Sequence, residues 1–315
     1  MRILGLVCLA AAFAFTGLAQ SGQPFLGRWD LTVTNSRDSW PQWMEIAEKD
    51  GHLDGRIQPR GGAVRPIVSA KVEGGHLLIV VSAAGRSREV DWDLTTEGDK
   101  ISGLQKQGEN SDTKITGVRA PDLKRPMPKA WTPPEALFNG TDLTGWEPIG
   151  NPANNHWTAK DGELVNEARG SNLRTTRTFQ DFQLHVEANC PNTLPDGKTQ
   201  LCNSGIYLRG RDEIQVGSEG GTVPSHEMGA LYGFVAPAKE MPLGAGEWQT
   251  FDITLVGRTL TVVRNGVTIH NKIEIPGITG GALDSNEGEP GPIFFQGDHD
   301  TGMRYRNITI SLPKN

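Results

Sequence analysis

The chain has 315 residues, of which 22% are charged and 36% hydrophobic, with 39 glycines and 20 prolines. This composition is typical of turn-rich globular domains, and the length is enough for about two of them at roughly 150 residues each. The formal net charge is -6 and no block of basic residues occurs, which excludes an electrostatic basis for binding nucleic acid.

The first residues predict an export signal, residues 1–19. Arg2 provides a positive start, residues 3–15 form a short apolar core, and small side chains favour cleavage after Ala19. An uncleaved membrane anchor is the alternative, but the apolar run is shorter than the ~20 residues that a span needs. We therefore expect a secreted or periplasmic protein with no membrane span after cleavage.

Cleavage would remove Cys8 and leave Cys190 and Cys202 as an even pair in an oxidising compartment. The two cysteines flank the loop PNTLPDGKTQL, which a disulfide would staple. Two free thiols are the alternative. A metal site on this pair is not expected, because no His or further Cys lies at ligand spacing.

Residues 24–119 alternate short apolar segments with glycine turns such as Asp50-Gly51. The pattern predicts a small antiparallel β-meander that forms a barrel-like domain. Trp40 and Trp43 could form an aromatic platform for sugar rings, or they could plug one end of the barrel.

Residues 120–135 contain five prolines, which predicts an extended linker. The second domain, residues 136–313, again shows short alternating strands, with hairpin turns at Asp161-Gly162 and Asn265-Gly266. Ten or more strands without a convincing amphipathic helix predict an all-β, two-sheet sandwich of jelly-roll type.

The segment NSGIYLRGRDEIQV, which begins at Asn203, reads as a β-hairpin in which every second residue is apolar and faces a core. A turn at residues 210–212 would produce two cross-strand pairs on the other face, Arg209 with Glu213 and Tyr207 with Gln215. That polar face is either solvated or the floor of a site, since both give the same alternation.

Nine motifs follow one another through the second domain. In chain order they are LFNGTDLTGW (137–146), W-x-x-x-DGEL (157–164), DFQLHVE (181–187), NSGIYLRG (203–210), EIQV (213–216), GALYG (229–233), GEWQTFDI (246–253), RNGV (264–267) and GPIFFQGDHDTGMRYRNI (291–308). Together they resemble the 3-keto-disaccharide hydrolase family. The resemblance implies a concanavalin A-like jelly roll with a carbohydrate groove, and an enzyme that cleaves glycosidic bonds.

Ordinary glycosidases place two carboxylates around the scissile bond, and glucanases of this fold take them from alternating positions of one strand. The comparable strand here carries Glu213 and then Gln215, whose amide cannot act as nucleophile or proton donor. Glu219 or Glu227 could supply the second acid. The family resemblance implies another route, in which a ketone at C3 acidifies the C2 proton and elimination followed by hydration cleaves the bond.

That route needs a base near C2, donors around the C3 oxygen and an acid for the leaving group. We expect Glu213, His299 and Arg209 to be catalytic, although Glu213 and Arg209 could be only a surface ion pair and His299 only a loop histidine. His226-Glu227 is a further candidate acid/base pair. The expected substrate-binding residues are Tyr207, Gln215, Tyr232, Gln296, Asp298, Arg304 and Arg306. Asn203 is expected to be structural or to contact sugar, and Trp248 to be a core or rim aromatic.

Four loop carboxylates, Asp284, Glu287, Asp298 and Asp300, could hold a divalent cation such as Ca²⁺, so the metal content stays open. No strand-to-helix glycine pattern supports a nucleotide cofactor. The main hypothesis is an exported enzyme acting on carbohydrate. A non-catalytic lectin of the same fold is the alternative, for which Gln215 in place of an acid would be natural, and a cell-surface interaction module is a third.

Overall fold

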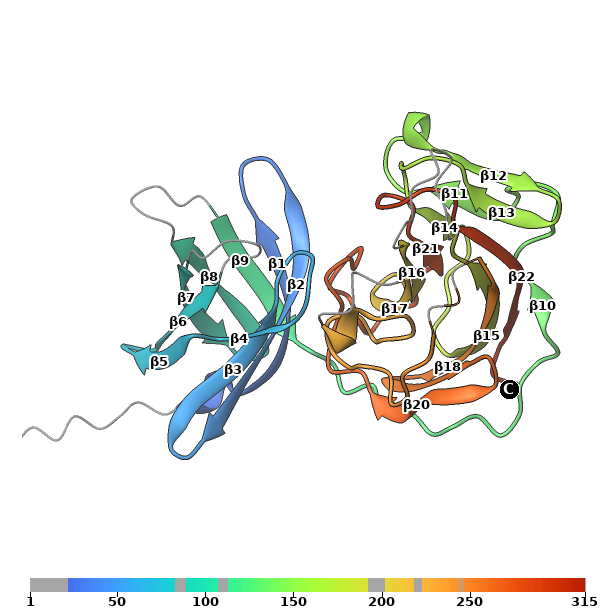
Figure 1. Ribbon diagram of the computed structural model, residues 1–315. Helices are drawn as coiled ribbons and strands as arrows, with labels where there is room; N and C mark the ends of the chain where they lie inside the picture. The colour runs from blue at the N-terminus through green and yellow to red at the C-terminus, as the bar shows by residue number, and fades with distance from the viewer. Residues whose placement is uncertain are drawn as a thin grey trace, which may run out of the picture.

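The computed structural model describes residues 22–82, 89–106, 113–191, 202–217, 223–242, 244 and 246–314. Figure 1 shows two β-bodies side by side, one built from the N-terminal strands in blue to green and one from the later strands. Three short 3-10 helices accompany them, Gln23–Phe25, Pro152–Asn154 and Pro224–His226. In the described ranges no helix is both long and apolar enough to cross a membrane, and the expected export signal lies outside these ranges.

The first body is one antiparallel sheet in the order β4-β3-β2-β1-β9-β8-β7-β6-β5. Its strands are β1 (Gly27–Thr34), β2 (Ser39–Lys49), β3 (His52–Gln58), β4 (Arg65–Pro66), β5 (Ser69–Glu73), β6 (His76–Ser82), β7 (Glu89–Glu97), β8 (Lys100–Lys106) and β9 (Thr113–Arg119). Between β4 and β5, the Ile67 N–H donates to Gly55 of β3 (2.9 Å) and the Val68 N–H donates to Val80 of β6 (2.8 Å). The segment that joins the two end strands thus bonds to β3 on one side and to β6 on the other, which closes the sheet into a barrel with few unpaired edges.

The barrel interior is filled by large apolar side chains. Trp29, Leu31 and Val33 of β1 are fully buried, and Trp92 of β7 joins them in the same core cluster. On the outer side of β1 and β2, Asp30 and Trp43 are paired across the strands and are buried as well. The second body must therefore cover the outer face of β1 and β2.

The second body is a sandwich of two antiparallel sheets (Figure 1). The larger has the order β12-β13-β22-β15-β18-β19-β20, with β10 also paired to β22, and the smaller has the order β11-β14-β21-β16-β17. The strands of the larger sheet are β10 (Glu135–Ala136), β12 (Trp157–Lys160), β13 (Glu163–Asn166), β15 (Phe182–Asn189), β18 (Trp248–Val256), β19 (Thr259–Arg264), β20 (Val267–Glu274) and β22 (Arg304–Ser311). Those of the smaller sheet are β11 (Trp146–Pro148), β14 (Leu173–Thr175), β16 (Asn203–Leu208), β17 (Asp212–Gly217) and β21 (Phe294–Phe295).

The apolar faces of the two sheets share one core. Phe251 and Ile253 of β18 belong to the same cluster as Ile206 and Ile214 of the hairpin, because alternate residues of each strand point inward. The predicted all-β class is confirmed.

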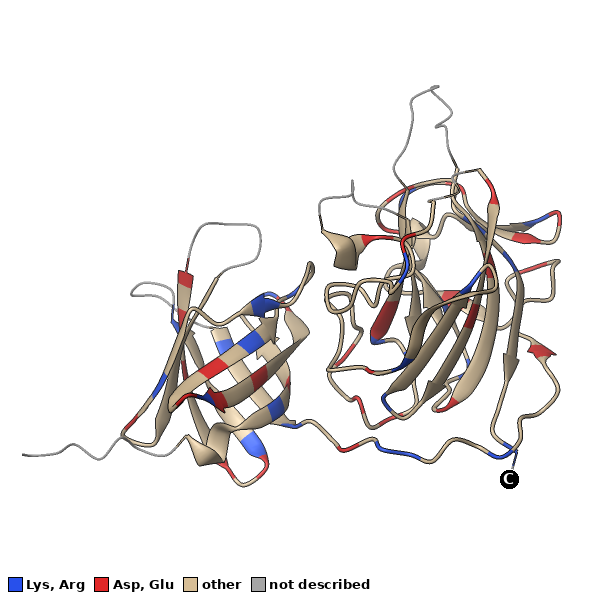
Figure 2. Ribbon diagram, turned by 60° about the horizontal axis from the view of Figure 1, so that its bottom comes forward, with Lys and Arg blue, Asp and Glu red and all other residues tan. Residues whose placement is uncertain are grey.

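Residues 120–134 run as an extended segment from the barrel along the second body (Figure 2). Arg125 forms an ion pair with Asp181 (3.2 Å), and Trp131 bridges to Pro313 beside the C-terminus. The segment is therefore bound to the sandwich by polar contacts along its length.

Cys190 and Cys202 form the expected disulfide, with their Cα atoms 5.8 Å apart. Most of the loop between them lies outside the described residues.

Trp43 is neither a sugar platform nor a plug of the barrel end. Its ring lies against Gly277 and meets Phe234 edge-on at 5.5 Å, so the contact between the two bodies covers it completely. Trp40 is half-buried, and the guanidinium of Arg60 lies 5.2 Å from the centroid of its ring.

Candidate active site

The hairpin of β16 and β17 has a different register from the expected one. Arg209 and Gly210 both have positive φ (52° and 73°), and the Arg211 N–H donates to Leu208 (3.0 Å), which makes a tight turn of the primed kind. Tyr207 consequently pairs with Glu213, not with Gln215. The predicted register is wrong by two residues, a slip that changes each partner but keeps every side chain on its face.

The polar face of the hairpin is not solvated. Tyr207 is 1% exposed and Glu213 is 2% exposed, because the loop after β20 lies over this face. Thr279 fastens the loop there, since its Oγ1 accepts the Glu213 N–H (3.1 Å) and donates to the Arg211 carbonyl (2.9 Å). The face is therefore the floor of a covered site.

Two donors among the described residues hold the Glu213 carboxylate. The Tyr207 hydroxyl donates to Oε2 (2.7 Å). The Gln215 amide nitrogen lies 3.2 Å from Oε1 in the orientation that satisfies both ends of that amide. Burial raises the pKa of Tyr207 well above its usual value, and the charge of Glu213 adds to the effect, so the phenol keeps its proton and donates.

Two glycines make room for this pair. A Cβ on Gly205 would lie 2.3 Å from Glu213 Oε1, and a Cβ on Gly281 would lie 2.0 Å from the Tyr207 hydroxyl. Both approaches are far closer than a side chain tolerates. The neighbouring strand and the covering loop thus come close to the carboxylate only because these two positions carry no side chain.

His299 and Asp298 form the second polar element of the site. His299 Nδ1 lies 2.7 Å from Asp298 Oδ1. This hydrogen bond raises the pKa of His299; partial burial opposes it, and the charges of Asp298 and Glu213 act in the same raising direction. Arg169 secures the segment, since its Nε donates to the Asp298 carbonyl (2.6 Å). The site therefore combines a buried carboxylate with an imidazole whose protonated form is favoured.

These groups line one pocket of about 150 Å³. Its lining residues are Gly61, Gly62, Asn172, Asn203, Tyr207, Glu213, Tyr232, Gly281, Gln296, Asp298 and His299. Gln296 is 9% exposed, and its Oε1 has no partner among the described residues. A buried acceptor without a partner costs free energy unless a ligand or water bonds to it, so Gln296 is suited to a polar ligand.

Six of the expected site residues meet in this pocket: Tyr207, Glu213, Tyr232, Gln296, Asp298 and His299. Asn203, for which a sugar contact and a structural role were both open, lines it as well. Gln215 does not line the pocket, and its amide nitrogen instead lies next to Oε1 of Glu213.

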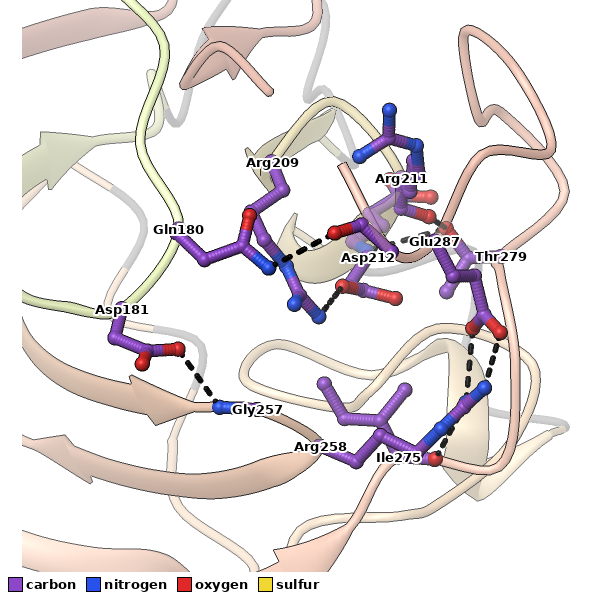
Figure 3. A network of polar contacts seen from close by, with 12 residues as sticks. Gln180, Asp181, Arg209, Arg211, Asp212, Gly257, Arg258, Ile275, Thr279 and Glu287 are labelled. Carbon is purple, nitrogen blue, oxygen red and sulfur yellow. Dashed lines mark hydrogen bonds and ion pairs between the residues drawn. The ribbon is translucent and has the colours of Figure 1, made fainter. Parts of the chain in front are cut away.

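Arg209 lies apart from Glu213. Its side chain is 3% exposed and its Nη2 is 3.2 Å from Asp212 Oδ2. Figure 3 shows its guanidinium group pointing toward Asp212, with the Arg258–Glu287 pair drawn in the same region. The expected Arg209–Glu213 pair is therefore wrong, because the turn includes Arg209 and redirects its side chain.

Arg304 and Arg306 share a face, as expected, but that face does not line the pocket. Arg304 is the first and Arg306 the third residue of β22 in the larger sheet, and their guanidinium groups lie 5.3 and 3.9 Å from the ring centroid of Trp248. Arg306 also pairs with Glu187 (2.7 Å). These arginines and Trp248 form a cluster on β18 and β22, away from the catalytic candidates.

Two other acidic residues were candidates for the second carboxylate, Glu219 and Glu227. Glu219 lies outside the described residues. Glu227 does not line the pocket, and His226 stacks on Tyr232 at 4.6 Å between ring centroids.

Three of the four carboxylates considered for a cation are each paired with a basic side chain: Asp284 with Arg211, Glu287 with Arg258, and Asp298 with His299. Within the described ranges, no group of three or more His, Cys, Asp or Glu residues could hold a metal ion.

Four pocket residues were not expected from the sequence: Asn172, Gly281, Gly61 and Gly62. Asn172 Oδ1 accepts the Gly297 N–H (2.8 Å) and so positions the segment that leads to Asp298. No motif marked these positions. The two barrel glycines lie more than a hundred residues before the hairpin, so only the packing of the two bodies brings them to the site.

The fold is a two-sheet β-sandwich, and its candidate site is a small pocket that brings a buried carboxylate and a histidine together. The chain belongs to the 3-keto-alpha-glucoside-1,2-lyase-like domain family, whose model matches residues 133–311. The predicted family is thereby confirmed, and membership supports a carbohydrate-active enzyme of the glycoside hydrolase type.

Several solved structures are similar to this chain, among them three described as candidate glycosyl hydrolases from Parabacteroides distasonis. The first is 27% identical, covers 60% of this chain and 93% of its own, and has a TM-score of 0.49. The second is 17% identical with coverages of 58% and 94% and a TM-score of 0.46. The third is 21% identical with coverages of 57% and 98% and a TM-score of 0.42. No curated protein matches this chain.

Proposed function

We propose that this protein cleaves the glycosidic bond of 3-keto-glycosides by elimination followed by addition of water. The observation that carries the proposal is the meeting of Glu213 with the His299–Asp298 pair in one small pocket. The family description, which names a 1,2-lyase acting on 3-keto-alpha-glucosides, supports the same chemistry.

The C3 ketone makes the C2 proton acidic. A base removes this proton, the electron pair of the C2–H bond forms the C1=C2 double bond through the enolate, and the C1–O bond breaks with its electrons leaving on the departing oxygen. A proton donor neutralises that oxygen. Water then adds to C1 and a proton returns to C2, so the sum is hydrolysis without any change in oxidation state.

Glu213 is suited to be the base, because a carboxylate fixed by Tyr207 and Gln215 is held in one orientation. His299 is suited to be the donor, since the adjacent Asp298 favours the imidazolium form. The unpartnered Oε1 of Gln296 would accept a hydrogen bond from a sugar hydroxyl. This route needs one carboxylate base and no nucleophile, so Gln215 is not an obstacle to it.

The test is to incubate the purified protein with a 3-keto-disaccharide and with the same disaccharide unoxidised, and to measure release of the monosaccharides. We expect cleavage of the keto sugar only, and a loss of at least about a hundredfold in kcat for Glu213→Gln. The matched control is Glu147→Gln, which alters a half-exposed carboxylate of β11 and should keep full activity. Binding of the keto sugar without any cleavage would refute the enzyme and indicate a lectin.

We also propose that the protein is exported. The apolar N-terminus with small residues before position 20 is typical of a cleaved signal, and the disulfide between Cys190 and Cys202 suits an oxidising compartment. Sequencing the N-terminus of the protein purified from its own cells would test this, with Gln20 expected as the first residue.

A further inference from the structure

The barrel contributes to the pocket although it lies outside the region that matches the family. Gly61 and Gly62, in the loop between β3 and β4, line the same pocket as Glu213 and His299. One wall of the pocket is thus formed by the barrel, whereas Glu213 and His299 belong to the sandwich.

Hydrogen bonds fix this loop from both sides. The Gly61 N–H donates to Gly280 (3.0 Å) and the Val64 N–H donates to Gly233 (3.2 Å). Gly280 and Gly233 are the chain neighbours of Gly281 and Tyr232, which line the pocket. The loop is therefore attached directly beside the residues of the site.

The close approach depends on small residues and a buried glutamine. A Cβ on Gly233 would lie 2.7 Å from the Ala63 Cα, and one on Gly280 would lie 2.9 Å from the Gly61 Cα. At the end of β3, Gln58 is buried and its Nε2 donates to the Gly62 carbonyl (2.7 Å). The loop conformation is thus specified by the barrel itself.

The rest of the contact gives the barrel a defined position. Trp43 forms a small apolar cluster with Ile278 and Ala282, against which Val64 and Phe234 pack. Ile278 adjoins Thr279, whose hydroxyl holds the backbone of Glu213. Burial of a fully covered tryptophan favours this arrangement strongly.

We propose that the barrel determines which sugars enter, with Gly61 and Gly62 forming the wall that limits the pocket to a single sugar ring. This rests on the proposed function for the identity of the sugar. The pocket of about 150 Å³ is well below the roughly 300–1,000 Å³ of sites for drug-sized ligands. A Cβ at either glycine would meet no atom within 4 Å, so a side chain there would fit the protein and compete with the ligand.

The first test is Gly62→Asn in the full chain. Gly62 has φ +71°, a conformation that Asn adopts more readily than other residues with a side chain. We expect KM for a 3-keto-disaccharide to rise about tenfold or more, with kcat changed less and the melting temperature lowered no more than in the control variant. The control is Gly51→Asn at the opposite end of β3, where φ is +78° and the space is equally open. Equal KM values for the two variants would overturn the proposal.

A second test needs no substrate. Gly62→Asp would place a carboxylate in the wall of the pocket that His299 also lines and should raise the pKa of His299 by about half a unit, as followed by NMR. Gly51→Asp should leave that pKa unchanged. If the wild type cleaves no keto sugar, the proposed function fails. The proposal that Gly62 forms a wall of the pocket is then tested by the pKa shift of His299 alone. No difference between the two Asp variants would show that Gly62 does not face the site.

Discussion

Replacing Asp30 by Asn should stabilise the protein at neutral pH and leave its stability in acid unchanged. Asp30 is on β1 and is 2% exposed, covered by the contact with the second body. It faces Glu287, which is itself held by both terminal nitrogens of Arg258 (Figure 3). Burial, followed by the charge of Glu287, raises the pKa of Asp30 to about 9, against the opposing effect of Arg258.

The size of the effect follows from proton linkage. The ordinary pKa of an aspartate is 3.8, so between about pH 4 and pH 9 the folded protein holds one proton more than the unfolded chain. The free energy of unfolding then falls by about 1.4 kcal/mol for each pH unit in this window. At pH 7, roughly three units above the ordinary value, the accumulated loss is on the order of 4 kcal/mol. An asparagine amide can donate to Glu287 as the protonated carboxyl does, without this loss.

The assay is urea unfolding at several pH values between 4 and 8, followed by tryptophan fluorescence and by circular dichroism. The difference in unfolding free energy between Asp30→Asn and wild type should be near zero at pH 4 and grow as the pH rises. Asp91→Asn, at an exposed position of β7, is the control and should show no such trend. A difference that stays constant with pH would refute the reasoning, because it would mean that Asp30 gains no proton on folding.

Two further outcomes are expected. The pKa of His299 is raised chiefly by its hydrogen bond to Asp298, so activity that needs the imidazolium should persist above pH 6.5 and fall as the pH rises through the raised value. Asp298→Asn should move this fall in kcat/KM to lower pH, and an unchanged profile would contradict the role of the pair. The Cys190–Cys202 disulfide spans 12 positions, and its removal in a double Cys→Ala variant should reduce the free energy of unfolding by about 3 kcal/mol in the chain-entropy model. Equal urea midpoints for the variant and the oxidised protein would exclude that stabilisation.

Local patterns in the sequence were sufficient to predict the strands and many of the residues that line the pocket. The alternation in residues 203–216 correctly assigned Tyr207 and Glu213 to one face and Ile206 and Ile214 to the other, because alternation is a property of a single extended chain. The motif GDHD made His299 and Asp298 site candidates, and both line the pocket. Neither result depends on knowing which other segment lies nearby.

Patterns that depend on a turn or on the partner sheet were less informative. The turn at Arg209-Gly210, in place of residues 210–212, exchanged every cross-strand partner and took Arg209 away from Glu213. Arg304 and Arg306 alternate as expected, but alternation cannot tell which face of β22 lies over the site. The face that carries these two arginines lies against Trp248 of β18.

By itself, the sequence determined the all-β class, the family, the disulfide pair and the shared face of Tyr207 and Glu213. These follow from residue types and short spacings, which act over a few residues of chain. Only the tertiary structure decided that this face is covered, and that Gly61 and Gly62 complete its pocket. The physical reason is that the cover arises where Trp43 and its neighbours bury their surface against a loop more than two hundred residues away, a contact that no local pattern records.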